Sequence, residues 1–200
     1  MIGFYSEKCM CYWLGLIICV VAFNHSVHAG ISSQVPGDPK VIQQEDIGEV
    51  LRAKKLDQLF AGLKVASTEQ DARRIEGAIW RLWLSSDNRA VDQKMQVIMA
   101  MRETQNYEEA ITLLNDLIAQ YPDYSEGWNQ RATIYYLLGN FEASVSDVAQ
   151  TLKREPRHFG ALSGLAIILW QQGNQDLARK SLSEAIRIHP FLRSQDMFDQ

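Results

Sequence analysis

The stretch "EGWNQRATIYYLLGNFEASVSDVAQTLKREP", from Glu126 to Pro156, has a counterpart later in the chain. "GALSGLAIILWQQGNQDLARKSLSEAIRIHP" runs from Gly160 to Pro190 with the same Gly-Asn pair and closing proline. Pro122 precedes Pro156 by the same interval as Pro156 precedes Pro190, which indicates a third copy. A fixed period of about 34 residues is typical of a solenoid of stacked supersecondary units. We therefore expect three repeats, over residues 91–124, 125–158 and 159–192.

Each copy contains signals that end one helix and begin the next. Gly139 and Gly173 predict a left-handed residue after the first helix. Asn140 and Asn174 follow them and predict an N-cap for the second helix. The proline then ends that second helix, because it lacks a backbone donor and restricts its neighbour. A single helix hairpin cannot bury its own apolar faces, so the copies must stack. The sequence predicts an all-α protein of about eight helices.

This layout resembles the tetratricopeptide repeat (TPR) family, whose pattern includes a tryptophan, a tyrosine, an alanine and a closing proline at set spacings. The middle copy matches it with Trp128, Tyr135 and Pro156, with Ser144 at the alanine position and Ala132 at a glycine position, although Arg131 replaces a leucine. The chain is similar to small exported TPR proteins of Gram-negative bacteria. The resemblance implies a solenoid whose first helices line a concave groove for a protein or peptide partner.

The family's groove-facing positions can be carried onto this chain. They mix methionine and aromatic residues with polar groups, which suits an extended or helical peptide. The alternative is that this wall packs against the chain's own N-terminal helices. The candidate groove residues are Met95, Met99, Arg102, Glu126, Asn129, Thr133, Tyr136, Ser163, Ile167 and Trp170.

Upstream of the repeats, residues 47–90 predict a helical pair, either a degenerate repeat or a cap. Ser67, with Gln70 three residues on, is the expected cap of its second helix. Trp80 and Trp83 of that helix are expected in the core rather than at a ligand. Residues 30–46 carry prolines and glycines without apolar periodicity and predict a flexible linker, and residues 193–200 form a short tail.

Residues 1–29 have the form of a secretory signal peptide. The apolar run 10–23 is shorter than the roughly 20 residues that a membrane span needs. It is followed by a small-residue pattern that predicts cleavage after Ala29 and a periplasmic location. An uncleaved leader that anchors the chain to the membrane is the alternative. Lipidation at Cys19 is disfavoured because the bulky Ile18 precedes it.

The remaining composition gives little sign of chemistry. The net charge is −4, and no dense Lys/Arg run predicts a nucleic-acid partner. Cys9, Cys11 and Cys19 all precede the expected cleavage site. His158 and His189 lie near the ends of different repeats and do not have metal-ligand spacing. No nucleophile elbow or phosphate loop is present, so we expect no cofactor, no metal and no enzymatic activity.

Three functions remain open at this point. The leading hypothesis is an exported adaptor or scaffold that binds its partner in the groove. The second is a membrane-tethered accessory subunit or chaperone of an envelope assembly complex, which requires an uncleaved leader. The third is an enzyme of an unrecognised kind.

Overall fold

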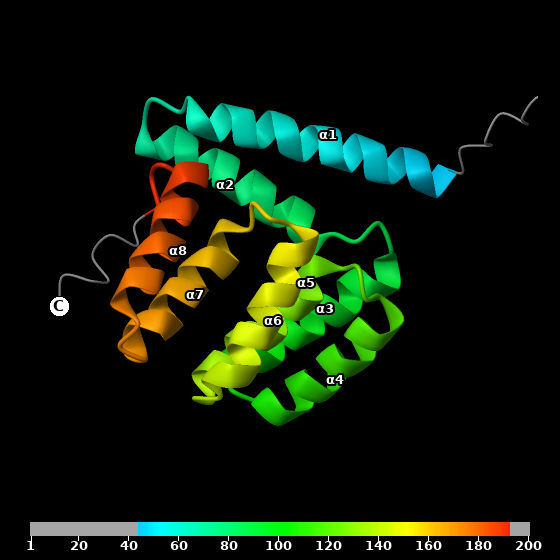
Figure 1. Ribbon diagram of the computed structural model, residues 1–200. Coiled ribbons are helices and arrows are strands. Elements are labelled where there is room, and N and C mark those ends of the chain that lie inside the picture. Colours follow the sequence, from blue (N-terminus) through cyan, green and yellow to red (C-terminus); the bar gives the residue numbers. More distant parts are fainter. Residues whose placement is uncertain (1–43, 193–200) are drawn as a thin grey trace, which may run out of the picture. The chain divides into compact units, whose positions relative to one another are not determined.

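The computed structural model describes residues 44–192, with side chains from residue 48 onward. The expected signal peptide, most of the expected linker and the tail 193–200 lie outside the described residues. The described part of the chain is all helical, and its helices pair as antiparallel hairpins (Figure 1). The eight helices of this range are α1 (Gln44–Lys64), α2 (Glu69–Leu84), α3 (Arg89–Glu103), α4 (Tyr107–Gln120), α5 (Ser125–Leu137), α6 (Phe141–Arg154), α7 (Phe159–Gln171) and α8 (Gln175–Ile188).

The three repeats correspond to the hairpins α3/α4, α5/α6 and α7/α8. Gly139 and Gly173 have φ values of 74° and 78°, so both adopt the expected left-handed conformation. Gln105 occupies the same position in the first repeat with φ 61°. The second helices α4, α6 and α8 each end two residues before a proline. These turn signals alone place the helix boundaries of the repeats.

The expected N-caps are only partly right. The Asn140 side chain accepts a hydrogen bond from the Ala143 backbone N–H, as predicted. Asn174 is at the predicted N-cap position of α8, but its side chain makes no capping hydrogen bond. The cap of α2 is also shifted by one residue, because Thr68 rather than Ser67 accepts from the Asp71 N–H. Both serine and threonine are good caps, and sequence alone does not distinguish two such neighbours.

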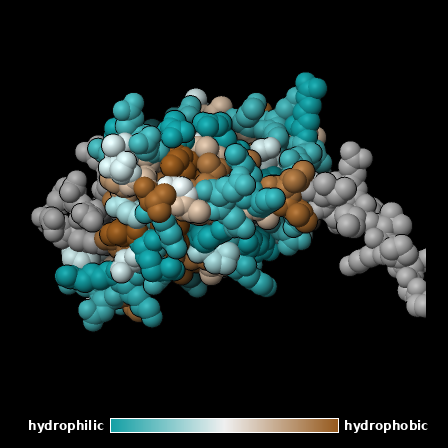
Figure 2. All heavy atoms as spheres, turned by 90° about the horizontal axis from the view of Figure 1, so that it is seen from above, coloured by the Kyte–Doolittle hydropathy of each residue, from teal (hydrophilic) through white to brown (hydrophobic). Residues whose placement is uncertain are grey.

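Helix α1 is longer than the sequence pattern predicts. It begins at Gln44, inside the segment that we expected to be a linker. Among the side chains of α1 that the structure describes, from residue 48 onward, the buried ones are Leu56, Phe60 and Leu63 in its C-terminal half. Val50 and Leu51 on its N-terminal half are 65% and 60% exposed. On the face that Figure 2 shows, hydrophobic side chains form small separate patches among hydrophilic ones.

The first hairpin packs against the last repeat. One buried cluster joins Phe60 of α1 and Trp83 of α2 to Phe159 of α7 and Ile188 of α8. A charged contact reinforces it, since Arg157 in the α6–α7 turn lies 2.6 Å from a carboxylate oxygen of Asp57 in α1. Figure 1 shows α2 beside the start of α7, with α1 outside it. Helices far apart in sequence therefore share one core.

The repeats themselves pack through small residues. Ala132, Ser144, Ala166 and Ala178 are all buried, with at most 3% of their surface exposed. The Ser144 hydroxyl donates to the Ala132 carbonyl oxygen at 2.8 Å, so even the polar member of this set is satisfied. Among the residues that the structure describes, none of the helices has both the length and the apolar character needed to cross a membrane.

Candidate groove and its pocket

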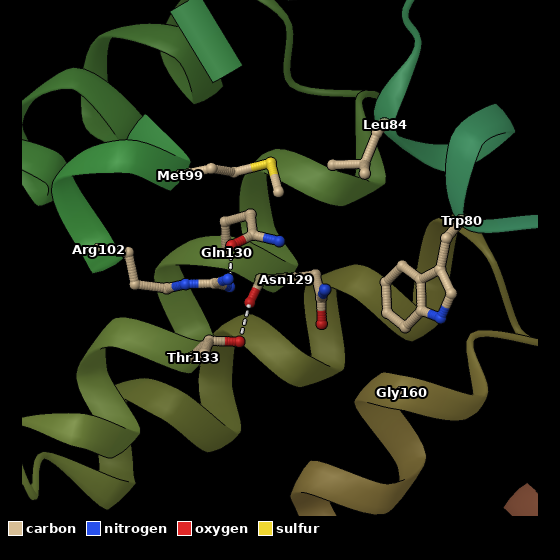
Figure 3. A pocket seen from close by; sticks show the side chains of 8 residues that line it. All are labelled: Trp80, Leu84, Met99, Arg102, Asn129, Gln130, Thr133 and Gly160. Carbon is tan, nitrogen blue, oxygen red and sulfur yellow. Dashed lines mark hydrogen bonds between the residues drawn. The ribbon is translucent and has the colours of Figure 1, made fainter. Parts of the chain in front are cut away.

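A pocket of about 300 Å³ lies where four helices meet. Helix α2 forms one wall, and the first helices of all three repeats form the rest (Figure 3). We call this site the α2–α5 pocket. Its lining residues are Trp80, Leu84, Met99, Arg102, Asn129, Gln130, Thr133 and Gly160.

A buried carboxylate organises the polar side of the pocket. Glu126, in the first turn of α5, has none of its surface exposed. One of its oxygens accepts hydrogen bonds from the side-chain amides of Asn129 at 3.0 Å and Gln130 at 2.6 Å. The other lies 3.1 Å from Nε2 of His158. These three partners satisfy the carboxylate, which would otherwise be costly to bury.

The protonation of His158 follows from its second contact. The backbone N–H of Ala161 donates to Nδ1 of His158 at 3.1 Å, so Nδ1 carries a lone pair. Nε2 therefore carries the hydrogen and donates it to Glu126. The imidazole caps α7 with one nitrogen and holds α5 with the other. Its ring also stacks on the Trp83 indole at 4.1 Å and 9°, which fixes α2 to the same point.

Arg102 connects this network to the pocket opening. Its guanidinium donates to the side-chain oxygen of Gln130 at 2.7 Å, while the Gln130 amide nitrogen donates to Glu126. Gln130 thus lies between the two charged groups and uses both ends of its amide. Figure 3 shows Arg102 reaching toward Gln130 from α3, on the opposite side of the pocket from Trp80. The result is a fixed row of polar groups along the pocket.

The wall that α2 contributes depends on a glycine in α7. A Cβ atom on Gly160 would lie 2.8 Å from Cη2 and 3.0 Å from Cζ2 of Trp80. Real Cβ atoms do not approach other heavy atoms so closely without displacement. Gly160 therefore lets the Trp80 ring lie directly on the start of α7. This contact orients the indole so that it both packs against Trp83, at 5.1 Å between ring centroids, and lines the pocket.

The predicted groove residues do not form one continuous surface. Met99, Arg102, Asn129 and Thr133 line the pocket. Met95 and Glu126 are buried, with 1% and 0% exposed, so neither presents a surface to a partner in this structure. Met95 packs with the α3–α4 core, and Glu126 is covered by its network.

The other four predicted groove residues lie outside the pocket lining, and all are half-buried. The Tyr136 hydroxyl accepts from Gln171 at 3.1 Å. The Ser163 hydroxyl donates to the Phe159 carbonyl oxygen at 2.7 Å. The Arg179 guanidinium lies 5.7 Å from the centroid of the Trp170 ring. The use of these residues, and of Ile167, for partner binding stays a prediction.

The pocket also includes residues that sequence reasoning assigned elsewhere or did not single out. Trp80 was expected only in the core, whereas it is half-buried and forms the pocket wall. Leu84 and Gln130 were not singled out at all. The available signal was the combination of Gly160, in the first helix of the last repeat, with Trp80 and Trp83 three residues apart in α2. A glycine inside a helix often marks a close approach of another group, and a tryptophan is a large enough group to need one.

A second histidine–carboxylate pair lies away from the pocket. His189 Nε2 is 3.3 Å from Oε2 of Glu76, although neither ring nitrogen of His189 makes a well-aligned hydrogen bond within the described part of the chain. The interaction with this imidazole holds the pKa of Glu76 below its ordinary value, against the opposing effect of partial burial. Within residues 48–192 there is no cluster of three His, Cys, Asp or Glu side chains that could hold a metal ion.

Comparison with known proteins assigns the repeats to a family. The sequence profile described as "Tetratricopeptide repeat" matches residues 100–150 and 130–192. A "TPR repeat-containing protein" of Rhizobium etli is 39% identical over 137 residues, which cover 68% of this chain and 67% of that protein. A second protein of the same description, from Methanocaldococcus jannaschii, is 29% identical over 82 residues, which cover 41% of this chain and 14% of that protein. The chain belongs to the TPR family, and as such it is a protein-interaction scaffold.

Solved structures include similar arrangements of helices. The crystal structure of MamA matches with a TM-score of 0.48 at 18% identity, covering 73% of this chain and 86% of that one. A point mutant of MamA matches with a TM-score of 0.46 at 15% identity, covering 68% of this chain and 96% of that one.

Proposed function

We propose that this chain is an exported, non-catalytic TPR adaptor that holds an extended segment of a protein partner in the α2–α5 pocket. The observation that carries the proposal is the convergence of α2, α3, α5 and α7 on one pocket with both apolar and hydrogen-bonding walls. Ligand pockets have volumes of about 300–1,000 Å³, so this one suits one or two side chains of a partner. The remaining contacts would come from the neighbouring faces of α3, α5 and α7.

The chemistry of the lining supports a peptide rather than a compact small molecule. Trp80 and Met99 offer large apolar contact area, and residues of this kind anchor protein interfaces. The side chains of Asn129 and Thr133 can exchange hydrogen bonds with a peptide backbone. Their positions are fixed, because Asn129 donates to Glu126 and Thr133 donates to the Asn129 carbonyl oxygen at 2.9 Å. A preorganised wall of this kind loses little entropy on binding.

Export is the second part of the proposal, and it rests on the leader sequence alone. An intact-mass measurement of the protein purified from its native envelope tests it. A mass that begins at Gly30 in the soluble periplasmic fraction supports the adaptor. A full-length chain that begins at Met1 in the membrane fraction supports the tethered accessory subunit instead.

Partner binding is tested by site-specific photocrosslinking with a matched control. A benzophenone amino acid replaces Thr133 in the pocket or Thr112 on the exposed face of α4. The two threonines are comparable, because each lies on a helix and donates its hydroxyl to the carbonyl oxygen four residues earlier, at 2.9 Å and 3.0 Å. We expect a discrete partner adduct in the native envelope from position 133 and none from position 112. The same adducts from both positions, or none from either, would contradict the pocket as the binding site.

A further inference from the structure

The α2–α5 pocket has one charged lining residue. Of its eight lining residues, Arg102 alone carries a formal charge, in a chain whose net charge is −4. The guanidinium has five N–H donors, and one hydrogen bond from it is present in the described structure, to Gln130. Within the described residues no carboxylate lies within ion-pair distance of Arg102. The pocket therefore presents positive charge to whatever enters it.

Glu126 does not neutralise this charge by direct contact. Its two oxygens are taken by Asn129, Gln130 and His158. Gln130 is oriented with its amide nitrogen toward Glu126 and its oxygen toward Arg102. A direct bond between Arg102 and Glu126 would require this amide to leave both of its partners. The cation at the pocket edge thus remains available to an anionic group from outside.

The Trp80 wall of the pocket lies opposite this cation. Figure 3 shows the Trp80 ring on the side away from Arg102, with Asn129 and Gln130 between them and with Met99 and Leu84 along an adjacent edge. Successive side chains of an extended peptide point to opposite sides. An acidic residue and its apolar neighbour in one extended segment can therefore reach the two sides together. A C-terminal carboxylate does not have this geometry, because it continues the backbone rather than branching from it.

We propose that the pocket selects a partner segment in which a side-chain carboxylate stands next to a large apolar side chain. The carboxylate forms charge-assisted hydrogen bonds with Arg102, and the apolar side chain packs against Trp80, Leu84 and Met99. This inference rests on the proposed adaptor function and specifies the chemistry of its partner. Charge-assisted hydrogen bonds are about twice as strong as neutral ones. We therefore expect at least about a tenfold preference, equivalent to about 1.4 kcal/mol, for glutamate over the isosteric glutamine.

The test uses a library of short fluorescent peptides with acetylated N-termini and amidated C-termini. The library consists of peptide pairs in which one member has Glu and the other has Gln next to a Leu or Phe. Binding of each peptide to the full exported chain is followed by fluorescence polarisation. Arg102→Gln should remove the preference for Glu while retaining binding of the Gln member. The matched control is Arg89→Gln, an exposed residue at the start of the same helix, which should keep the full preference.

Measurements on the unmodified protein make the test independent of variant folding. Affinity for the Glu peptides should fall as sodium chloride is raised, because screening weakens the ion pair, whereas affinity for the Gln peptides should change little. Peptides that bind without a Glu preference, or whose preference survives Arg102→Gln, would overturn the inference and leave the adaptor function standing. A stronger response to a free C-terminal carboxylate would also overturn it. If no peptide binds and the chain self-associates instead, a second copy is the occupant, and the specific inference and the proposed function both fail.

Discussion

Replacing Gly160 with alanine tests whether α2 really lies on the start of α7. The new methyl group would lie 2.8 Å from a ring carbon of Trp80, and the His158 ring would be 3.4 Å away. The indole cannot yield by a simple bond rotation, because it is also in contact with Trp83 and Phe159 at centroid distances of 5.1 Å and 5.7 Å. The substitution therefore forces the wall of the pocket to move.

The magnitude can be estimated by comparison with a second glycine on the same helix. Gly164 lies one turn further along α7, and a Cβ there would meet no atom within 4 Å. Gly164→Ala should stabilise the protein by about 0.5–1 kcal/mol, because alanine loses less backbone entropy in a helix. Gly160→Ala adds an overpacking cost of about 1–3 kcal/mol. We expect the net effect to be a loss of up to about 2.5 kcal/mol in the free energy of unfolding, so the two variants should differ by the overpacking cost itself, about 1–3 kcal/mol.

The assay is urea unfolding followed by far-UV circular dichroism, whose signal in an all-helical protein comes mainly from the backbone. A double-mutant cycle adds Trp80→Ala, which removes the obstructing ring. In that background Gly160→Ala should become neutral or stabilising, like Gly164→Ala, and the coupling energy should be about 0.5–3 kcal/mol. If Gly160→Ala alone stabilises the protein as much as Gly164→Ala does, Trp80 does not lie on α7 and the pocket wall described above is wrong.

Three further variants probe other parts of the fold. Tyr124→Phe removes the hydroxyl that donates to the Leu84 carbonyl oxygen at 2.9 Å. Urea melts should show that the free energy of unfolding falls by about 1 kcal/mol. An unchanged midpoint would mean that this hydrogen bond does not stabilise the α2–α3 connection. The pKa of Glu76 is lowered by His189 from an ordinary value of 4.5, so its stabilising contribution is present above that pH and is lost as the pH falls through the lowered value. Thermal melts between pH 3 and 6 should show a shallower acid-dependent loss for Glu76→Gln than for the wild type, and parallel curves would refute the linkage. Gly139→Val places a branched side chain at φ 74° and should lower the free energy of unfolding by about 1–2 kcal/mol in the same melts. An unchanged unfolding transition would mean that the turn lies at another residue.

The repeats could be predicted from sequence because their signals are local. A left-handed φ after a helix, seen at Gly139 and Gly173, and a proline two residues after the next helix are properties of a few neighbouring residues. Helix α1 was harder to predict, since Val50 and Leu51 are exposed and leave no apolar periodicity in its first half. A helix that buries only one end gives a sequence signal over only that end.

The site could be predicted only in part, because it depends on a contact between distant segments. Met99 and Thr133, which the family positions assign to the groove, line the pocket. They also suggested Glu126, whose side chain is instead buried and bonded to Asn129, Gln130 and His158. That difference arises because α2 covers this part of the groove, and no repeat pattern specifies where a preceding hairpin packs. The N-terminal helices therefore pack against part of the predicted groove, as the alternative proposed. The pocket lies next to that part of the groove.

The packing of the first hairpin against the last repeat also constrains how this gene can change length. Repeat arrays commonly gain or lose units by duplication or deletion, because each unit contacts only its neighbours. Here an added or deleted repeat between α3 and α6 would carry α7 and α8 away from α2. The core that joins Phe60 and Trp83 to Phe159 and Ile188 would then be exposed to water. Selection should therefore keep three repeats in proteins that share this N-terminal hairpin, and let repeat number vary where the hairpin is missing.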